Sequence, residues 1–171
     1  MGTFTYVEMK CNLDEQGVIK SDLETGLQLE PIDAISPESL YQCYLDTFRA
    51  GDAQFFQLQD EDEQSRYYQE ELGFPEVLDN PASFAFLLDG DLIGFSLVMA
   101  YLEKNYHISC MCILPAYQGK GYGAQMLDQI QSIALKNEIE TLTLGTEPDM
   151  KAFQLYHKGG FEVTAEHTVG E

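Results

Sequence analysis

The sequence predicts a mixed α/β domain in which a mostly antiparallel sheet contains one parallel pair of strands and is flanked by about four helices. Three features support this fold class. Short apolar segments separated by turn residues fill residues 84–114, a glycine-rich loop leads from them into an amphipathic helix, and another strand follows that helix. The 171 residues, of which 44% are apolar, fit a single domain that spans residues 1–171.

The chain begins with two strand patterns. Residues 3–9 alternate between apolar and polar side chains, as an edge strand does, and residues 26–32 form a second short strand after a turn at Gln16-Gly17. Nothing in the first 25 residues indicates whether they join the main sheet. Residues 1–25 are therefore a candidate N-terminal extension.

Two helices are expected next. Ser36 supplies an N-cap, Pro37 occupies the first helical position, and Gly51 ends the first helix. A second helix over residues 62–72 carries the densest run of acidic side chains. We expect these carboxylates on a solvated face, because charged residues at this spacing most often point away from the core.

The pattern then changes to strands. Residues 84–88 and 92–101 flank the turn Asp89-Gly90-Asp91, and a third strand covers residues 106–114. Strands joined by such short turns pair in an antiparallel manner. Residues 84–114 therefore predict an antiparallel meander.

A strand-loop-helix-strand unit follows the meander. After the glycine loop at residues 119–123, a helix precedes a strand over residues 140–144, which implies a crossover and parallel pairing. The apolar side of this helix carries Met126, Leu127, Ile130 and Ala134. Asp149 is expected to cap a last helix, which a glycine pair ends before a strand over residues 161–167.

The net charge of −20 argues strongly against a nucleic-acid partner, because phosphates would be repelled at long range. It favours a cationic or neutral substrate. Residues 1–100 hold 20 acidic and 4 basic side chains, whereas residues 101–161 hold 6 and 5. A ligand of the second half can therefore itself be anionic.

The four cysteines do not follow the spacing of a metal site and are expected to be free thiols in a reducing cytosol. A Cys110 nucleophile with His107 as its base is the less favoured alternative. No segment has the composition of an export signal or the roughly 18 apolar residues of a membrane helix. We expect a cytoplasmic protein with no membrane partner and no metal.

Three alternating glycines, at 119, 121 and 123, stand between a strand and a helix. They leave backbone N–H groups uncovered at a positive helix end, which predicts a pyrophosphate cradle with Lys120 as its cation. A turn without a ligand needs fewer glycines. A Walker loop is excluded because its pattern is absent. A dinucleotide fingerprint is formally present as Gly119-x-Gly121-x-x-Ala124, but the acids Glu138 and Glu140 open the next strand instead of ending it.

Two spaced segments of the second half share a pattern with a known family. Residues 113–123 read ILPAYQGKGYG and residues 149–161 read DMKAFQLYHKGGF. They resemble the two motifs of the GNAT superfamily of acetyl-CoA-dependent N-acetyltransferases. Asp149 stands where the second motif has asparagine. The resemblance is specific from about residue 84 to residue 163 and implies a GNAT-like sheet whose parallel strands splay apart.

In this family the pantetheine arm of the cofactor lies between the splayed strands, and its pyrophosphate meets the glycine loop. The resemblance therefore assigns binding of acetyl-CoA, the acetyl donor, to a set of residues on the strand, the loop and the last helix. They are Met111, Cys112, Ile113, Gln118, Gly119, Lys120, Gly121, Tyr122, Gly123, Ala124, Asp149 and Ala152.

The resemblance also suggests catalytic residues. Tyr156 is the candidate proton donor to the leaving thiolate, and its alternative role is a helix aromatic packed in the core. Many relatives carry a carboxylate on the strand before the loop, where this sequence has Ser109 and Cys110. Glu147 is the candidate general base, with an exposed loop acid as the alternative. Three aromatic side chains of the helical segment are expected either to line the acceptor site or to pack in the core. They are Phe55, Phe56 and Tyr67.

Together these features predict an N-acetyltransferase that transfers an acetyl group from acetyl-CoA to a primary amine of a small molecule or protein. The expected acceptor is a cationic amine. A non-catalytic acyl-CoA-binding sensor is the alternative, suggested by Asp149 and by the missing strand carboxylate. The sequence is compatible with a homodimer without indicating one.

Overall fold

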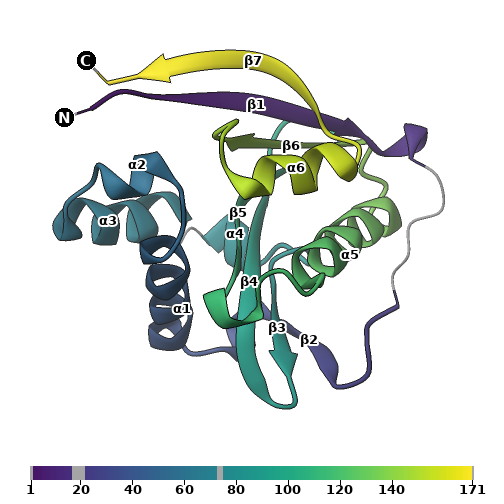
Figure 1. The fold of residues 1–171 in the computed structure, drawn as a ribbon. Helices are drawn as coiled ribbons and strands as arrows, with labels where there is room; N and C mark the ends of the chain where they lie inside the picture. The colour runs from purple at the N-terminus through teal and green to yellow at the C-terminus, as the bar shows by residue number, and fades with distance from the viewer. Residues whose placement is uncertain (1, 17–21, 73–74, 171) are drawn as a thin grey trace.

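Seven strands of the described residues form one mixed sheet in the order β2-β3-β4-β5-β6-β1-β7 (Figure 1). The computed structural model describes residues 2–16, 22–72 and 75–170. All neighbouring strands are antiparallel except β5 and β6, which run parallel as predicted. The strands are β1 (Phe4–Asn12), β2 (Leu27–Pro31), β3 (Phe84–Leu88), β4 (Asp91–Ala100), β5 (Asn105–Ile113), β6 (Thr141–Thr146) and β7 (Glu162–Val169).

The N-terminal strand β1 is an inner strand, so the expectation of an edge strand was wrong. It pairs with β6 on one side and with β7 on the other, and it joins the main sheet. The alternating side chains Val7, Met9 and Cys11 are buried. Alternation reports one buried face but not how many edges of a strand are paired. The two ends of the chain run side by side (Figure 1), and Gly17 of the expected turn lies outside the described residues.

The helices begin and end at recognisable signals. Ser36 accepts a hydrogen bond from the Ser39 N–H and caps α1 (Pro37–Arg49), as predicted. Asp60 caps α3 (Glu61–Tyr67), which continues as the π-helix η3 (Tyr68–Leu72) and together with it covers the second predicted helix. The remaining helices are α2 (Gln54–Gln57), α4 (Pro75–Leu78), α5 (Tyr122–Lys136) and α6 (Lys151–Lys158). Short 3₁₀ turns are η1 (Leu13–Glu15), η2 (Ile32–Ala34) and η4 (Pro115–Tyr117).

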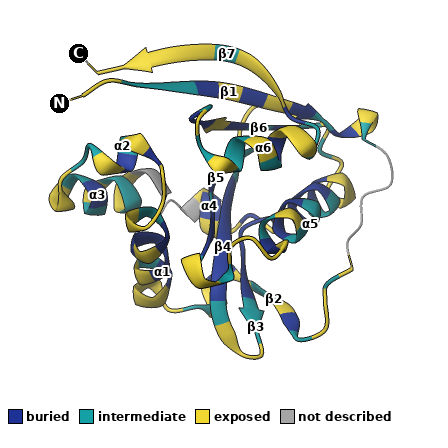
Figure 2. Ribbon diagram, in the orientation of Figure 1, coloured by how far each residue is buried: buried dark blue, intermediate teal, exposed yellow. Residues whose placement is uncertain are grey.

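A hydrophobic core lies on each face of the sheet, with α1 to α3 on one side and α5 and α6 on the other (Figure 1). Met126 and Ile130 of α5 fill the first core, whereas Leu40 and Tyr44 of α1 fill the second. Strand β4 is buried along most of its length and β7 is exposed (Figure 2). All four cysteines are buried and free. No helix among the described residues is long and apolar enough to cross a membrane.

Two irregularities of β5 position the functional site. First, β5 and β6 pair only from Asn105↔Thr141 to Ile108↔Leu144, and the two strands separate beyond this point. Second, Ile108 and Cys110 pair with consecutive residues of β4, so Ser109 forms a β-bulge. Ile108 consequently faces the core of α5, whereas Cys110 faces the core of α1.

Candidate active site

A cavity of about 710 Å³ lies along the open side of β5, where β6 has separated from it. The N-terminal loop of α5 and residues of α6 line one part of the cavity. Side chains of β1, α1, α2 and α3 line another part. The volume is within the range of about 300–1,000 Å³ that is typical of small-molecule sites.

The glycine loop provides an anion site at one end of this cavity. Gly119 and Gly121 have φ angles of +77° and +89°, which favour glycine, and a Cβ at either position would meet nothing within 4 Å. Gly121 is the N-cap of α5, and no described side chain caps this helix. The backbone N–H groups of the first turn therefore face open space at the positive end of a 15-residue helix.

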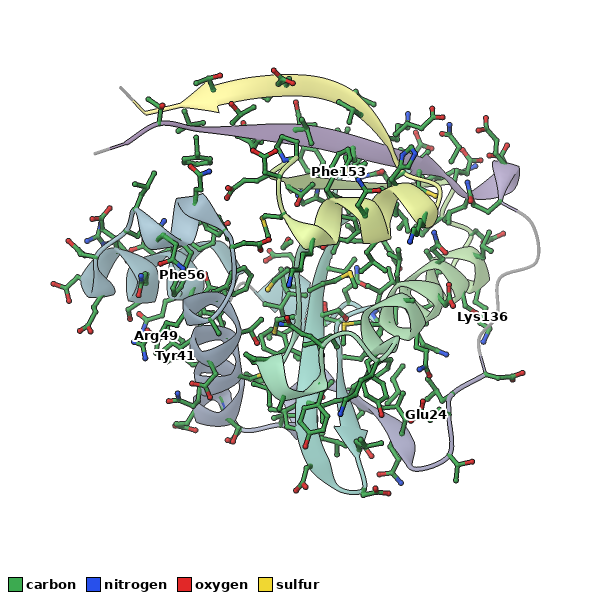
Figure 3. All side chains as sticks on the ribbon, viewed as in Figure 1. Glu24, Tyr41, Arg49, Phe56, Lys136 and Phe153 are labelled. Atoms are coloured by element: carbon green, nitrogen blue, oxygen red, sulfur yellow. The ribbon has the colours of Figure 1, made fainter. Side chains whose placement is uncertain are left out.

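Three predicted loop residues differ in how they contribute. The Gln118 side-chain amide donates to the Ile113 carbonyl at 2.8 Å and holds the loop against the end of β5. Tyr122 is buried, and its hydroxyl donates to Glu24 Oε2 at 2.9 Å, in the segment before β2 (Figure 3). The Lys120 ammonium lies 5.9 Å from the centre of the Tyr117 ring. Lys120 and Tyr122 do not line the cavity, so their backbone groups are what they can offer a ligand there.

The other predicted binding residues lie together. Met111, Cys112 and Ile113 line the cavity from the unpaired part of β5. Gly123, Ala124 and Ala152 line it from the starts of α5 and α6. Sequence positions separated by up to 41 residues thus meet in one wall.

Tyr156 of α6 lines the same cavity and is 8% exposed. Its ring packs edge-on against Phe161 at 6.0 Å between ring centres, so it is also a core residue. Its hydroxyl has no hydrogen-bond partner among the described residues. Burial raises the pKa of the Tyr156 phenol well above its usual value, and the Cys110 and Cys112 thiols raise it further. The phenol is therefore protonated at neutral pH and can donate a hydrogen bond into the cavity.

Glu147 lines the cavity but is committed to another contact. It is 5% exposed, and its Oε1 and Oε2 atoms accept hydrogen bonds from the Gln54 and Phe55 N–H groups at 2.9 and 3.0 Å. The carboxylate therefore holds the start of α2 against the end of β6. Glu147 is therefore not an exposed loop acid, which was the alternative to its role as general base. Its contact with Gln54 joins residues that are 93 positions apart.

Asp149 is exposed, does not line the cavity and does not cap α6. The expected cap was wrong because residues 147–150 form a turn, in which the Met150 N–H donates to the Glu147 carbonyl, so the helix begins after Met150. Asp52 provides the missing acceptor from the segment after α1. Its Oδ2 atom accepts a hydrogen bond from the Lys151 N–H at 3.1 Å.

Aromatic side chains form the wall opposite the glycine loop. Of the three predicted aromatics, Phe55 and Tyr67 line the cavity, whereas Phe56 is buried against side chains of α1 (Figure 3). Further aromatics were missed as site residues, among them Phe4 and Tyr6 of β1 and Tyr44 and Phe48 of α1. The sequence carries no signal for the β1 residues, because their place depends on which strands β1 joins.

A histidine that the sequence suggested only as a base for Cys110 also belongs to the site. His107 of β5 lines the cavity, and its Nδ1 atom lies 3.0 Å from Thr143 Oγ1 on β6. Its position on a predicted strand near Cys110 was the available signal. The bulge at Ser109, which brings Cys110 to the same face of the sheet as His107, was not visible in the sequence.

Comparisons with known proteins fit this architecture. The model of the Acetyltransferase (GNAT) family matches residues 38–161. A search of curated proteins found no match.

Several solved structures share the fold. A GCN5-related N-acetyltransferase from Sphaerobacter thermophilus has a TM-score of 0.68 at 14% identity, covering 96% of this chain and 51% of its own. The PaiA N-acetyltransferase of Thermoplasma acidophilum, in complex with coenzyme A, has a TM-score of 0.63 at 17% identity. The match covers 81% of this chain and 91% of the Thermoplasma chain. A GCN5-related N-acetyltransferase from Kribbella flavida has a TM-score of 0.60 at 15% identity. The match covers 98% of this chain and 58% of the Kribbella chain. This chain thus spans about half of the Sphaerobacter protein.

Proposed function

Since this chain belongs to the GNAT acetyltransferase family, we propose that it transfers an acetyl group from acetyl-CoA to a primary amine of a small molecule or protein. The observation that carries the proposal is that the glycine cradle and the gap between β5 and β6 open into one cavity. The cradle suits a pyrophosphate, and the gap leaves one edge of β5 free for an extended arm.

The residues present fit acetyl-CoA. The backbone N–H groups between Gly119 and Ala124 would hold the pyrophosphate, and residues 111–113 would hold the arm. A Cβ added to Gly119 or Gly121 would meet no protein atom within 4 Å, so a ligand has room to approach the backbone there. When bound, acetyl-CoA supplies an acetyl group activated as a thioester.

Tyr156 has the protonation state that the proposed role requires. A buried phenol with a raised pKa and no protein partner among the described residues is available to hydrogen-bond the leaving sulfur. Glu147 stays a candidate base, but its contact with α2 supports a positioning role more strongly.

The proposed acceptor is a cationic amine. A net charge of −20 attracts cations at long range, and the aromatic wall can bind an ammonium group over its ring faces. An acceptor attracted in this way binds as an ammonium ion. The site must therefore remove a proton from its nitrogen before that nitrogen can attack the thioester.

One observation favours the alternative of a non-catalytic acyl-CoA sensor. Both oxygens of the buried carboxylate in the cavity, Glu147, already accept backbone hydrogen bonds. A sensor needs the cradle but no base.

Measuring thiol release from acetyl-CoA across a panel of primary amines tests the two functions. Release that depends on an amine supports the transferase. Tight binding of acetyl-CoA without release for any amine supports the sensor.

A further inference from the structure

His107 stands beside the point at which β5 and β6 separate. It is one residue before Ile108, the last residue of β5 that pairs with β6. Cys110, which lines the cavity together with Tyr156, is three residues further along the strand. At about 3.3 Å per residue the two positions are about 10 Å apart, a span that an acyl group and an attacking amine can fill.

Strand alternation directs His107 toward the face that carries the aromatic wall, and the bulge at Ser109 brings Cys110 to the same face. Tyr106 and Ile108 face the core of α5, and side chains alternate along a strand, so His107 points to the opposite face. Beyond the bulge, Cys110 points to that same face, which is covered by α1. The glycine cradle and His107 therefore lie on opposite faces of the sheet, joined by the gap between the strands.

A hydrogen-bond network fixes the imidazole. Asn105 Nδ2 donates to Thr143 Oγ1 at 3.2 Å and to the Tyr101 carbonyl at 2.8 Å, and Thr141 Oγ1 donates to Asn105 Oδ1 at 2.7 Å. Thr143 Oγ1 has a second lone pair, which can accept the Nδ1–H of His107. In that tautomer Nε2 carries a lone pair and is free to accept a proton.

The carboxylates that line the cavity are poorer candidates. Glu147 would lose a backbone hydrogen bond on protonation, because both of its oxygens are acceptors. Asp52 is exposed and accepts from the Lys151 N–H. Both carboxylates are therefore engaged by backbone N–H groups, whereas the Nε2 atom of His107 has no protein partner among the described residues.

We propose that His107 is the general base of the transfer, an inference that rests on the proposed function. The amine nitrogen forms a bond to the thioester carbonyl carbon, and the carbon–sulfur bond breaks. His107 Nε2 takes the proton that the charged amine loses before attack and returns it to solvent, and the nitrogen of the tetrahedral adduct then loses its second proton by the same route. The leaving sulfur receives a proton from the Tyr156 phenol, which is reprotonated from solvent, so the products are an amide and a thiol.

The protonation state of His107 agrees with this role. Burial lowers the pKa of the imidazole, so it is neutral at pH 7. Titratable groups near it include Glu8 and Tyr101. Glu8 of β1 partly opposes the lowering through its charge, and the Tyr101 ring lies edge-on at 6.2 Å. Because the folded pKa lies below the usual 6.5, base activity should be lost only as pH falls through that lower value.

The kinetic test is kcat/KM against pH for the wild type and His107→Gln, with an amine whose pKa is above 9. We expect a wild-type bend below pH 6.5, and in the variant a loss of about 10²- to 10⁴-fold at pH 7 with the bend absent. His157→Gln, on the exposed end of α6, should keep both rate and bend.

A second readout needs no substrate. Of the three histidines, the NMR signal that disappears in His107→Gln should titrate below pH 6.5 in the free protein. Turnover and an acid bend unchanged in His107→Gln would overturn this inference alone, as would a His107 signal titrating above 6.5. No amine-dependent turnover by the wild type would overturn the proposed function and this inference together.

Discussion

Replacing Glu147 with alanine separates a structural role from a catalytic one. The carboxylate accepts two backbone hydrogen bonds from α2, and a bond to a charged group contributes about 1.5–3 kcal/mol. Water can replace part of both bonds because they are only partly buried, so we take the loss in the free energy of unfolding as about 3 kcal/mol. A domain of 171 residues loses about 2–4 °C per kcal/mol, which predicts a fall in Tm of about 6–12 °C.

Thermal unfolding of Glu147→Ala measures this loss, with Glu162→Ala on the exposed strand β7 as the control. The control should shift Tm by less than about 2 °C, as surface substitutions usually do. Below its Tm, Glu147→Ala should keep its affinity for acetyl-CoA. The reasoning is refuted if Tm is unchanged while kcat falls about 10³-fold, because Glu147 would then be the base.

Three further predictions test other parts of the site. Tyr156→Phe should lower kcat about 10²-fold while calorimetry finds the affinity for acetyl-CoA unchanged, and an unchanged kcat would remove its role as proton donor. Gly94→Ala should lower the free energy of unfolding in urea by about 1–3 kcal/mol, because its Cβ would collide with the Cys112 carbonyl oxygen; wild-type stability would contradict that packing. The thiols should resist alkylation in the native protein, since burial raises the pKa of Cys11 to about 11 and that of Cys112 well above its usual value. Mass spectrometry should find four modified cysteines only after unfolding, and rapid native labelling would contradict their burial.

Turn and cap residues in the sequence predicted those helices and strands whose ends they determine. The strand Phe84–Leu88 ends at a glycine turn, and α1 begins at a Ser-Pro pair, so both matched closely. The one-turn helices α2 and α4 were missed because four residues carry no periodic pattern. The pairing of β1 depends on strands at least 129 residues away, which no local pattern encodes.

In the candidate site, too, features built from adjacent residues were predicted and contacts between distant segments were not. The cradle follows from glycines that are adjacent in the sequence, and the predicted loop did form at the start of α5. Contacts between distant segments could not be predicted, such as Glu147 with the start of α2 and Asp52 with the start of α6. His107 was predicted as a strand residue, but the bulge at Ser109, which places Cys110 on the same face of the sheet, could not be predicted from the sequence.

The most direct test of the proposed cofactor site is calorimetric titration of acetyl-CoA into the wild type, Gly121→Glu and Gly90→Glu. Gly121 and Gly90 have φ angles of +89° and +90°, and a Cβ at either would meet nothing within 4 Å, so both variants carry a similar backbone strain. Only Gly121 belongs to the cradle. We predict saturable binding by the wild type and Gly90→Glu that is lost in folded Gly121→Glu. No binding by the wild type, or equal binding by all three proteins, would contradict the account.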